Sequence, residues 1–168
     1  WLLRVHLSFL GVVLVVWSGS TFLRNREWGS EALLFESAEL VCPKSVKILN
    51  NLGMNLLHPD TSARAVELLD RAVKIHPTYD VGYFNLGLAH HLSHQKMEAI
   101  AAYEHSLQIN PNQSKCRAYL GHELLLLAID LENRGDTEST TALLISAEEQ
   151  LNRAIIEGHD TPILYHSR

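Results

Sequence analysis

The sequence lacks the features that most often mark a catalytic or nucleic-acid-binding domain. It has no phosphate-binding glycine loop, no metalloprotease motif and no Cys-x-x-Cys pair. Charged residues make up 20% of the chain and the formal net charge is −5, which argues against electrostatic binding of nucleic acid. These absences direct attention away from catalysis and towards the spacing of the apolar residues.

Three prolines stand 34 residues apart, and a Leu-Gly pair recurs in the same register. The prolines are Pro43, Pro77 and Pro111, and the pairs are Leu52-Gly53, Leu86-Gly87 and Leu120-Gly121. A period of 34 is the signature of the tetratricopeptide repeat (TPR), a helix-turn-helix unit that stacks into a solenoid. We therefore predict an all-α TPR solenoid over residues 44–168, with full repeats at 46–79 and 80–113.

Helix packing explains the small and large residues within each repeat. The first repeat carries Leu49, Leu52, Gly53, Leu56, Ala65, Leu69 and Ala72, and the second carries Tyr83, Leu86, Gly87, His90, Ala99, Tyr103 and Ser106. The large residues fall on helical spacing and are predicted to fill the seam between helices. The Gly of the first helix is predicted to face the first Ala of the second helix, and the closing proline to end that helix.

The third repeat, residues 114–161, is irregular. The small residue expected early in its second helix comes 14 residues late, at Ala147. We predict a first helix extended to about Asn133, a polar turn over residues 134–141, and then the second helix. Residues 161–165 resemble the start of a fourth repeat, and an unfinished solenoid exposes apolar surface, so we expect the chain to be a fragment.

A half-repeat precedes the first full one. Phe35, Ala38 and Pro43 repeat, 34 residues earlier, the spacing of a second helix. Residues 24–43 are therefore predicted to hold a junction and a capping helix between Trp28 and Val41, with Ser30 at the helix start.

The first 23 residues differ in kind from the repeats. Residues 7–17 form an apolar run broken only by Ser8, with Arg4 before it. One interpretation is a transmembrane helix over residues 1–23, the last of a multi-spanning domain. The alternative is a signal peptide, since a basic start, a short apolar centre and small residues follow in that order. The pattern alone leaves both interpretations open.

Two opposing signals bear on the side of the membrane that the repeats occupy. Arg24 and Arg26 follow the apolar segment and favour the cytosol by the positive-inside tendency. Asn112 opens the sequon Asn-Gln-Ser on the turn after Pro111, and is a candidate N-glycosylation site, which requires the lumen.

Asn51 and Asn85 are the candidate peptide-binding residues. Both stand directly before Leu-Gly, at a position that points into the concave groove of a TPR superhelix. An asparagine amide offers both a donor and an acceptor to a peptide backbone, and the arrangement resembles the asparagine ladder of the O-linked N-acetylglucosamine transferase repeats. Asparagine is also common at this position in TPRs generally, and Tyr119 replaces it in the third repeat. Lys47, Phe84 and His122 occupy neighbouring positions of the repeat register, and no feature of the sequence singles them out as groove residues.

Histidines and cysteines indicate neither a metal site nor a disulfide. His90 and His94 are spaced to share a helical face, but no third ligand stands out, so packing and exposure explain these residues and His91 better than metal does. Cys42 and Cys116 lie two repeats apart, too far to bond in a rigid solenoid, and are expected to be buried small residues. We predict no metal and no cofactor in this segment.

The residues before the first full repeat resemble a known junction. Three short stretches follow one another in a fixed order: Thr-Phe-Leu-Arg-Asn-Arg-Glu-Trp, then Ser-Glu with Leu-Phe, and finally Val-Cys-Pro-Lys-Ser with a following Asn-Leu-Gly. This set resembles the junction of the transmembrane and TPR-containing (TMTC) O-mannosyltransferases, where the last membrane helix passes into the repeats. The matched positions are Arg24, Asn25, Trp28, Glu31, Cys42, Pro43 and Lys44.

The resemblance implies a multi-spanning protein of the endoplasmic reticulum membrane with its repeats in the lumen. It implies transfer of mannose from dolichyl phosphate mannose to Ser or Thr of secretory proteins, cadherins among them. The catalytic acidic residues of that family lie in a membrane domain that this sequence does not contain, so no catalytic residue is assigned. The implied orientation overrules the cytosolic signal of Arg24 and Arg26.

We therefore predict that the repeats hold an unfolded or extended protein acceptor, or a chaperone, near the catalytic domain of such an enzyme. One alternative is a non-enzymatic TPR adaptor with a single membrane anchor. Another is a secreted TPR protein with a signal peptide.

Overall fold

The computed structural model describes residues 2–27 and 30–158. Over these residues the chain forms eight helices and no strand, which confirms the all-α prediction. The helices divide between two compact units, Trp1–Pro43 and Lys44–Arg168, and each unit is described by itself.

The first unit begins with a helix of 26 residues, α1 (Leu2–Glu27). Its described large apolar side chains are mostly exposed: Leu10, Val12, Leu14, Val15, Val16, Trp17 and Phe22. The hydroxyls of Ser18 and Thr21 donate to carbonyls one turn earlier, so these polar groups are satisfied within the helix. Over the described residues, no helix combines the length and the apolar character needed to cross a membrane, and the predicted span over residues 1–23 is not confirmed.

The second helix of this unit is α2 (Glu31–Val41). Ser30 precedes it with an extended backbone (φ −146°, ψ 132°), the conformation of an N-cap residue, although its hydroxyl makes no capping hydrogen bond. Trp28 lies outside the described residues. Cys42 is exposed, contrary to the prediction, because it follows the last turn of α2 instead of lying on a packed helical face. That α2 caps the first full repeat stays a prediction.

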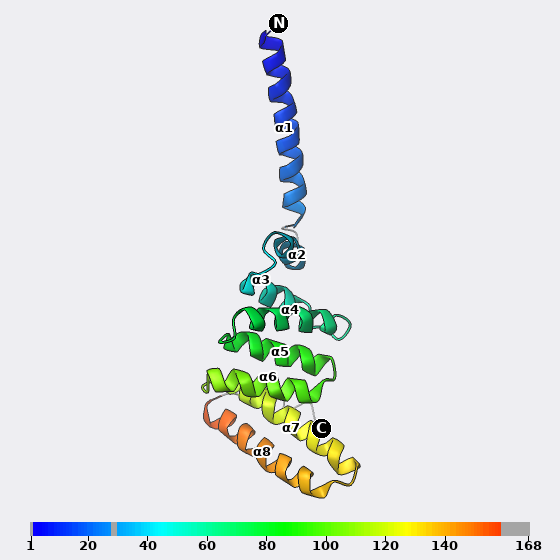
Figure 1. Cartoon of the computed structure of the whole chain (residues 1–168), viewed down its shortest axis with the longest axis vertical. Coiled ribbons are helices and arrows are strands. Elements are labelled where there is room, and N and C mark those ends of the chain that lie inside the picture. The colour runs from blue at the N-terminus through cyan, green and yellow to red at the C-terminus, as the bar shows by residue number, and fades with distance from the viewer. Residues whose placement is uncertain (1, 28–29, 159–168) are drawn as a thin grey trace. The chain divides into compact units, whose positions relative to one another are not determined.

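Residues 44–158 form helix pairs that pack in chain order. The pairs are α3 (Val46–Asn55) with α4 (Ser62–Ile75), α5 (Asp80–Leu92) with α6 (Lys96–Ile109), and α7 (Ser114–Asn133) with α8 (Thr137–Ile156). In Figure 1 they lie as successive layers. One buried cluster, which includes Leu69 and Leu86, joins the first pair to the second, and another, which includes Tyr103 and Leu120, joins the second to the third. Each pair therefore buries its apolar face against its neighbour, as in a solenoid.

The periodic prolines lie just beyond the second helix of a pair. α4 and α6 each end two residues before a proline, Pro77 or Pro111, and proline has no N–H with which to continue a helix. Gly158 follows α8 instead and takes φ 82°, a left-handed conformation that glycine adopts without a Cβ clash. Residues 161–165, the predicted start of a fourth repeat, lie outside the described residues.

The third pair is longer than the second. α7 and α8 each have 20 residues, whereas α5 has 13 and α6 has 14. The insertion thus adds about two turns to each helix, and whole turns keep the packed face of the helix unchanged. The predicted polar turn over residues 134–141 is shorter than expected, because α8 begins at Thr137. Asp136 explains the early start, since its carboxylate accepts from the N–H of Ser139 at 3.2 Å as an N-cap.

The repeated glycines bring the two helices of a pair close together. A Cβ added to Gly53 would lie 2.6 Å from Cγ of Leu69, and one added to Gly87 would overlap the ring of Tyr103. At Gly121 an added Cβ would lie 3.2 Å from the carbonyl oxygen of Ala147, the early small residue of the second helix, as well as 2.7 Å from Cγ of Leu151. In all three pairs the nearest group to the glycine is a large side chain of the second helix. The physical reason is that the large side chain projects across the seam and fills the space that the glycine leaves.

Gly53→Ala is expected to lower the stability of the protein by about 1 kcal/mol. Overpacking of a core costs roughly 1–3 kcal/mol, whereas the gain in helix propensity from Gly to Ala is about 1 kcal/mol. The free energy of unfolding is measured by urea denaturation with circular dichroism at 222 nm. The matched control is Gly19→Ala in α1, where an added Cβ meets nothing within 4 Å. Equal effects of the two substitutions would contradict the close Gly53–Leu69 contact.

Candidate binding face

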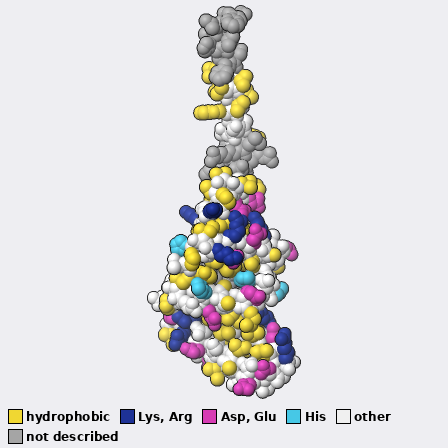
Figure 2. All heavy atoms as spheres, viewed as in Figure 1, with side chains coloured by type: hydrophobic (Ala, Val, Ile, Leu, Met, Phe, Trp, Pro, Cys, Tyr) yellow, Lys and Arg dark blue, Asp and Glu magenta, His cyan; other side chains and the backbone are white. Residues whose placement is uncertain are grey.

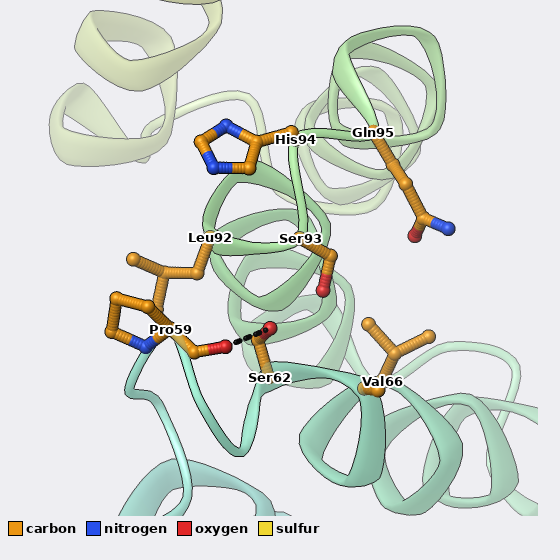
Figure 3. A pocket seen from close by; sticks show the side chains of 8 residues that line it. Pro59, Ser62, Val66, Leu92, Ser93, His94 and Gln95 are labelled. Atoms are coloured by element: carbon orange, nitrogen blue, oxygen red, sulfur yellow. Dashed lines mark hydrogen bonds between the residues drawn. The ribbon is translucent and has the colours of Figure 1, made fainter.

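A hollow of about 470 Å³ opens where the turn before α4 meets the turn after α5. It is lined by Pro59, Ser62, Ala63, Val66, Leu92, Ser93, His94 and Gln95. Figure 3 shows the Ser62 hydroxyl turned back to the carbonyl of Pro59, to which it donates at 3.0 Å. His94 is the one titratable side chain of this lining, so the hollow offers no acid–base pair.

A second hollow, of about 420 Å³, lies on the α7–α8 pair. Its lining is mostly apolar: Leu125, Leu144, Ala147, Glu148, Leu151, Asn152 and Ile155. Figure 2 shows hydrophobic side chains gathered on the surface of this end of the repeats. The hollow again brings together no catalytic set.

The polar and aromatic groups of the second unit meet elsewhere, on the first helices of the three pairs. Side chains of α3, α5 and α7 contact one another from helix to helix, and we call this surface the first-helix face. It consists of Asn50, Asn51, Phe84, Asn85, His91, Tyr119, His122 and Glu123. Three groups of contacts make up the face: a chain of amides, a set of aromatic rings, and an imidazole–carboxylate cluster.

The amide chain contains both predicted peptide-binding residues. Asn85 is buried, and its Nδ2 donates to Oδ1 of Asn50 at 2.8 Å. Asn50 in turn donates to Oδ1 of Asn51 at 3.4 Å. Sequence reasoning missed Asn50 because the equivalent position of the second repeat is Phe84, so the 34-residue period conceals it.

The two predicted asparagines differ in what they can offer a ligand. The Nδ2 group of Asn85 is engaged with Asn50, and the side chain is only 4% exposed. Asn51 is half-buried and acts as an acceptor towards Asn50, so that contact does not use its N–H groups. The role of Asn51 and Asn85 in peptide binding stays a prediction.

Two aromatic rings, those of Phe84 and Tyr119, continue the face from α5 to α7, and both lie near a third, buried ring from α6. Phe84 lies 5.6 Å from Tyr119, centroid to centroid, in an edge-on arrangement, and each of these rings lies 6.0 Å from that of Tyr103 in α6. These are the distances at which aromatic pairs attract one another. Tyr103 is fully buried, and burial, followed by the charge of Glu123, raises the pKa of its hydroxyl. Phe84 and Tyr119 are only half-buried and are open to a ligand.

The imidazole–carboxylate cluster consists of His91 in α5 and His122 and Glu123 in α7. Glu123 is fully buried, its Oε1 is hydrogen-bonded to Nδ1 of His91, and Nδ1 of His122 lies 3.8 Å from the same oxygen. Burial acts to raise the pKa of Glu123, but hydrogen bonds and charge from the two imidazoles outweigh it and lower the pKa to about 2. The hydrogen bond to Glu123 raises the pKa of His91. A signal for this cluster was present in the sequence, because Glu123 takes the position of the buried Ala89.

Two other histidines and the buried cysteine are not part of this cluster. His90 is hydrogen-bonded through Nδ1 to Oε1 of Gln95 at 2.7 Å. His94 lies beyond the end of α5 with φ 58°, so it does not share a helical face with His90 as the sequence suggested. Burial raises the pKa of Cys116 to about 12, which keeps it a thiol and a poor nucleophile.

Asn112, the predicted glycosylation site, is exposed on the turn between α6 and α7. Its backbone N–H donates to Oδ1 of Asn110 at 3.2 Å, and Asn110 donates to Asp80 at 2.8 Å. The turn is thus held by its neighbour while the side chain of Asn112 is accessible. Its modification stays a prediction.

Comparison with solved structures identifies the fold. A crystal structure of MamA superposes with a TM-score of 0.55 at 20% identity, over 73% of this chain and 67% of MamA. A second MamA structure, from AMB-1, gives 0.56 at 23% identity, over 73% of this chain and 68% of that one. The chain has a tetratricopeptide-repeat fold. At these identities the likeness concerns the fold alone.

Comparison of sequences gives a weaker result. No protein-family model matches the chain. The human protein O-mannosyl-transferase TMTC3 is 28% identical over 163 residues, which is 95% of this TPR chain. The chain spans 18% of the length of that relative.

Asn85→Ala is expected to destabilise the TPR unit by about 1–3 kcal/mol. The substitution leaves the buried Oδ1 of Asn50 without its donor, and an unsatisfied buried acceptor carries that cost. Asn55→Ala in α3 is the matched control, since Asn55 is exposed and is expected to change stability by no more than about 0.5 kcal/mol. Urea denaturation of both variants measures the difference. An Asn85→Ala loss no larger than that of the control would show that the amide chain does not hold α3 to α5.

Proposed function

We propose that the TPR unit binds an extended segment of another protein along its first-helix face. The observation that carries this proposal is the continuity of the face, on which amide, aromatic and imidazole groups follow one another from α3 to α7. Amides pair with a peptide backbone without reading its side chains, and aromatic rings accept apolar side chains. Solenoids use extended surfaces of this kind to bind other chains.

The residues of the face have different tasks in this proposal. Asn85 is a positioning residue, because its buried amide joins α5 to Asn50 of α3. Asn51, Phe84 and Tyr119 are half-buried, so they have surface left to contact the bound chain. The ligand is therefore an unfolded or extended protein segment that lies across α3, α5 and α7.

We further propose that the TPR unit serves a protein O-mannosyltransferase. The similarity to TMTC3 over nearly the whole chain supports this, as does the order of apolar helix, junction and repeats. The activity would belong to a longer protein that transfers mannose from dolichyl phosphate mannose to Ser or Thr of secretory proteins such as cadherins. The TPR unit would hold the acceptor near the catalytic domain and so raise its effective concentration.

The same proposal places the protein in the endoplasmic reticulum membrane with the repeats in the lumen. The exposed apolar side chains of α1, such as Leu14 and Trp17, suit a lipid environment better than water, which supports a membrane role for this helix. The exposed position of Asn112 suits a lumenal glycosylation site.

A non-enzymatic adaptor is the second candidate function. The TPR fold by itself fits an adaptor that joins proteins, and such a protein would need only one membrane anchor. The two candidates differ in one measurable property. In microsomes supplied with labelled dolichyl phosphate mannose, the full-length enzyme would label acceptors and lose most of that labelling when residues 44–168 are deleted, whereas an adaptor would label none.

Asn51→Ala is expected to weaken the binding of an unfolded protein about fivefold or more. It removes one backbone-pairing amide, worth about 1 kcal/mol, from an accessible position of the face. The probe is fluorescently labelled, reduced and alkylated lactalbumin, followed by anisotropy. Asn55→Ala, one turn further along α3 and exposed, is the control and should leave the affinity unchanged. Wild-type affinity in both Asn51→Ala and Tyr119→Ala would contradict binding along this face.

Asn112→Gln is expected to abolish a shift in gel mobility that endoglycosidase H removes from the protein expressed in mammalian cells. The reason is that Asn112 is exposed on a turn that a lumenal oligosaccharyltransferase can reach. Ser114→Ala removes the same sequon without altering the asparagine and should have the same effect. A wild-type protein that is made at full length and carries no such glycan would argue against a lumenal position of the repeats.

A further inference from the structure

We propose that His91, His122 and Glu123 bind a divalent transition-metal ion, zinc in the first place, between α5 and α7. Nothing in the proposed peptide binding or mannose transfer requires such a site. The inference rests on three observations: the closeness of three donor atoms, the burial of an incompletely satisfied carboxylate, and the chemical type of the donors.

The three donor atoms, one from each side chain, all lie within 4.8 Å of one another. Ligands bound tetrahedrally to zinc at about 2.0–2.1 Å lie about 3.3 Å apart. Nδ1 of His91 is closer than this to Oε1 of Glu123, since the two share a hydrogen bond, whereas Nδ1 of His122 is 3.8 Å from that oxygen. An ion in place of the shared proton would therefore need side-chain movements of roughly 1 Å, which rotation of the two partly exposed rings can supply.

The carboxylate of Glu123 has bonding capacity that the protein leaves unused. The residue is fully buried, and its Oε2 has no hydrogen-bond partner. Among the described residues its ion-pair partners are the two imidazoles, with no lysine or arginine. A buried carboxylate with an unpaired oxygen is costly, and a bound cation removes that cost.

The donor set indicates which ion the site would take. Two imidazole nitrogens and one carboxylate oxygen form a set that zinc binds with its fourth position open to water or another ligand. Calcium and magnesium prefer sets made of oxygen atoms, so they are not expected to compete. The side chains of His91 and His122 are 34% and 20% exposed, which gives an ion access from solvent.

The position of the ligands predicts what the ion would do. His91 belongs to the second helix pair and the other two ligands belong to the third, so the ion would join consecutive repeats. A ligand that binds only the folded state stabilises it by mass action. The site lies on the first-helix face, where the open position could also accept an oxygen atom of a bound chain.

The test is a titration of the tag-free, chelator-treated protein with zinc sulfate by isothermal calorimetry. We expect one ion per chain, a rise in melting temperature with zinc but not with magnesium, and the visible absorption of tetrahedral cobalt when cobalt(II) replaces zinc. His91→Ala and His122→Ala are each expected to weaken zinc binding about tenfold or more. His58→Ala and His94→Ala, at exposed positions outside the cluster, are the matched controls and should bind as the wild type does.

Glu123→Gln keeps the size of the side chain and removes its charge, and we expect the same loss of zinc affinity. If that variant does not fold, as judged by its circular dichroism, the two histidine variants decide the question. Equal zinc affinity in His91→Ala, His122→Ala and the wild type would overturn the proposal. An equal loss in the two control variants, or a stoichiometry well above one, would overturn it as well, because either result indicates adventitious binding to surface histidines.

Discussion

The close contact between a glycine of the first helix and a large side chain of the second is the constraint on which the repeat unit depends. Gly53 lies against Leu69, and Gly87 lies against Tyr103. Because each pair closes in this way, its outer surfaces can bury apolar side chains against the next pair, and two buried clusters connect the three pairs. The same packing places α3, α5 and α7 near enough for their polar side chains to meet.

Polar side chains on α3, α5 and α7 make this surface different from that of a solenoid built from identical repeats. Asn50 with Asn85 joins α3 to α5, and His91 with Glu123 joins α5 to α7. Both contacts use buried or half-buried groups, for which the loss of one partner is costly. The first-helix face is therefore a pre-organised surface, a property that favours binding of a flexible segment by reducing the ordering cost on one side.

Much of the fold is predictable because it follows from local chemistry repeated at a fixed period. Pro77 and Pro111 follow the ends of α4 and α6, and the Leu-Gly pairs identify the first helix of each pair. The turn predicted over residues 134–141 is too long, because the carboxylate of Asp136 caps α8 and the helix begins at Thr137. Cys42 is exposed although small apolar residues such as cysteine are usually buried, because it follows the last turn of α2.

The sequence by itself determined the helical class, the 34-residue unit and the residues that pack within and between pairs. These features follow from the spacing of apolar residues and from helix-ending residues, which act over short distances along the chain. The sequence also identified Asn51 and Asn85 as candidate peptide-binding residues. Only the tertiary structure decided which partners the polar side chains take. Asn50 meets Asn85 and His91 meets Glu123 across 35 and 32 residues of sequence, respectively, and such pairings depend on the exact rotation and spacing of neighbouring helices. Helix rotation is set by the packing of the whole pair, which no single position reveals.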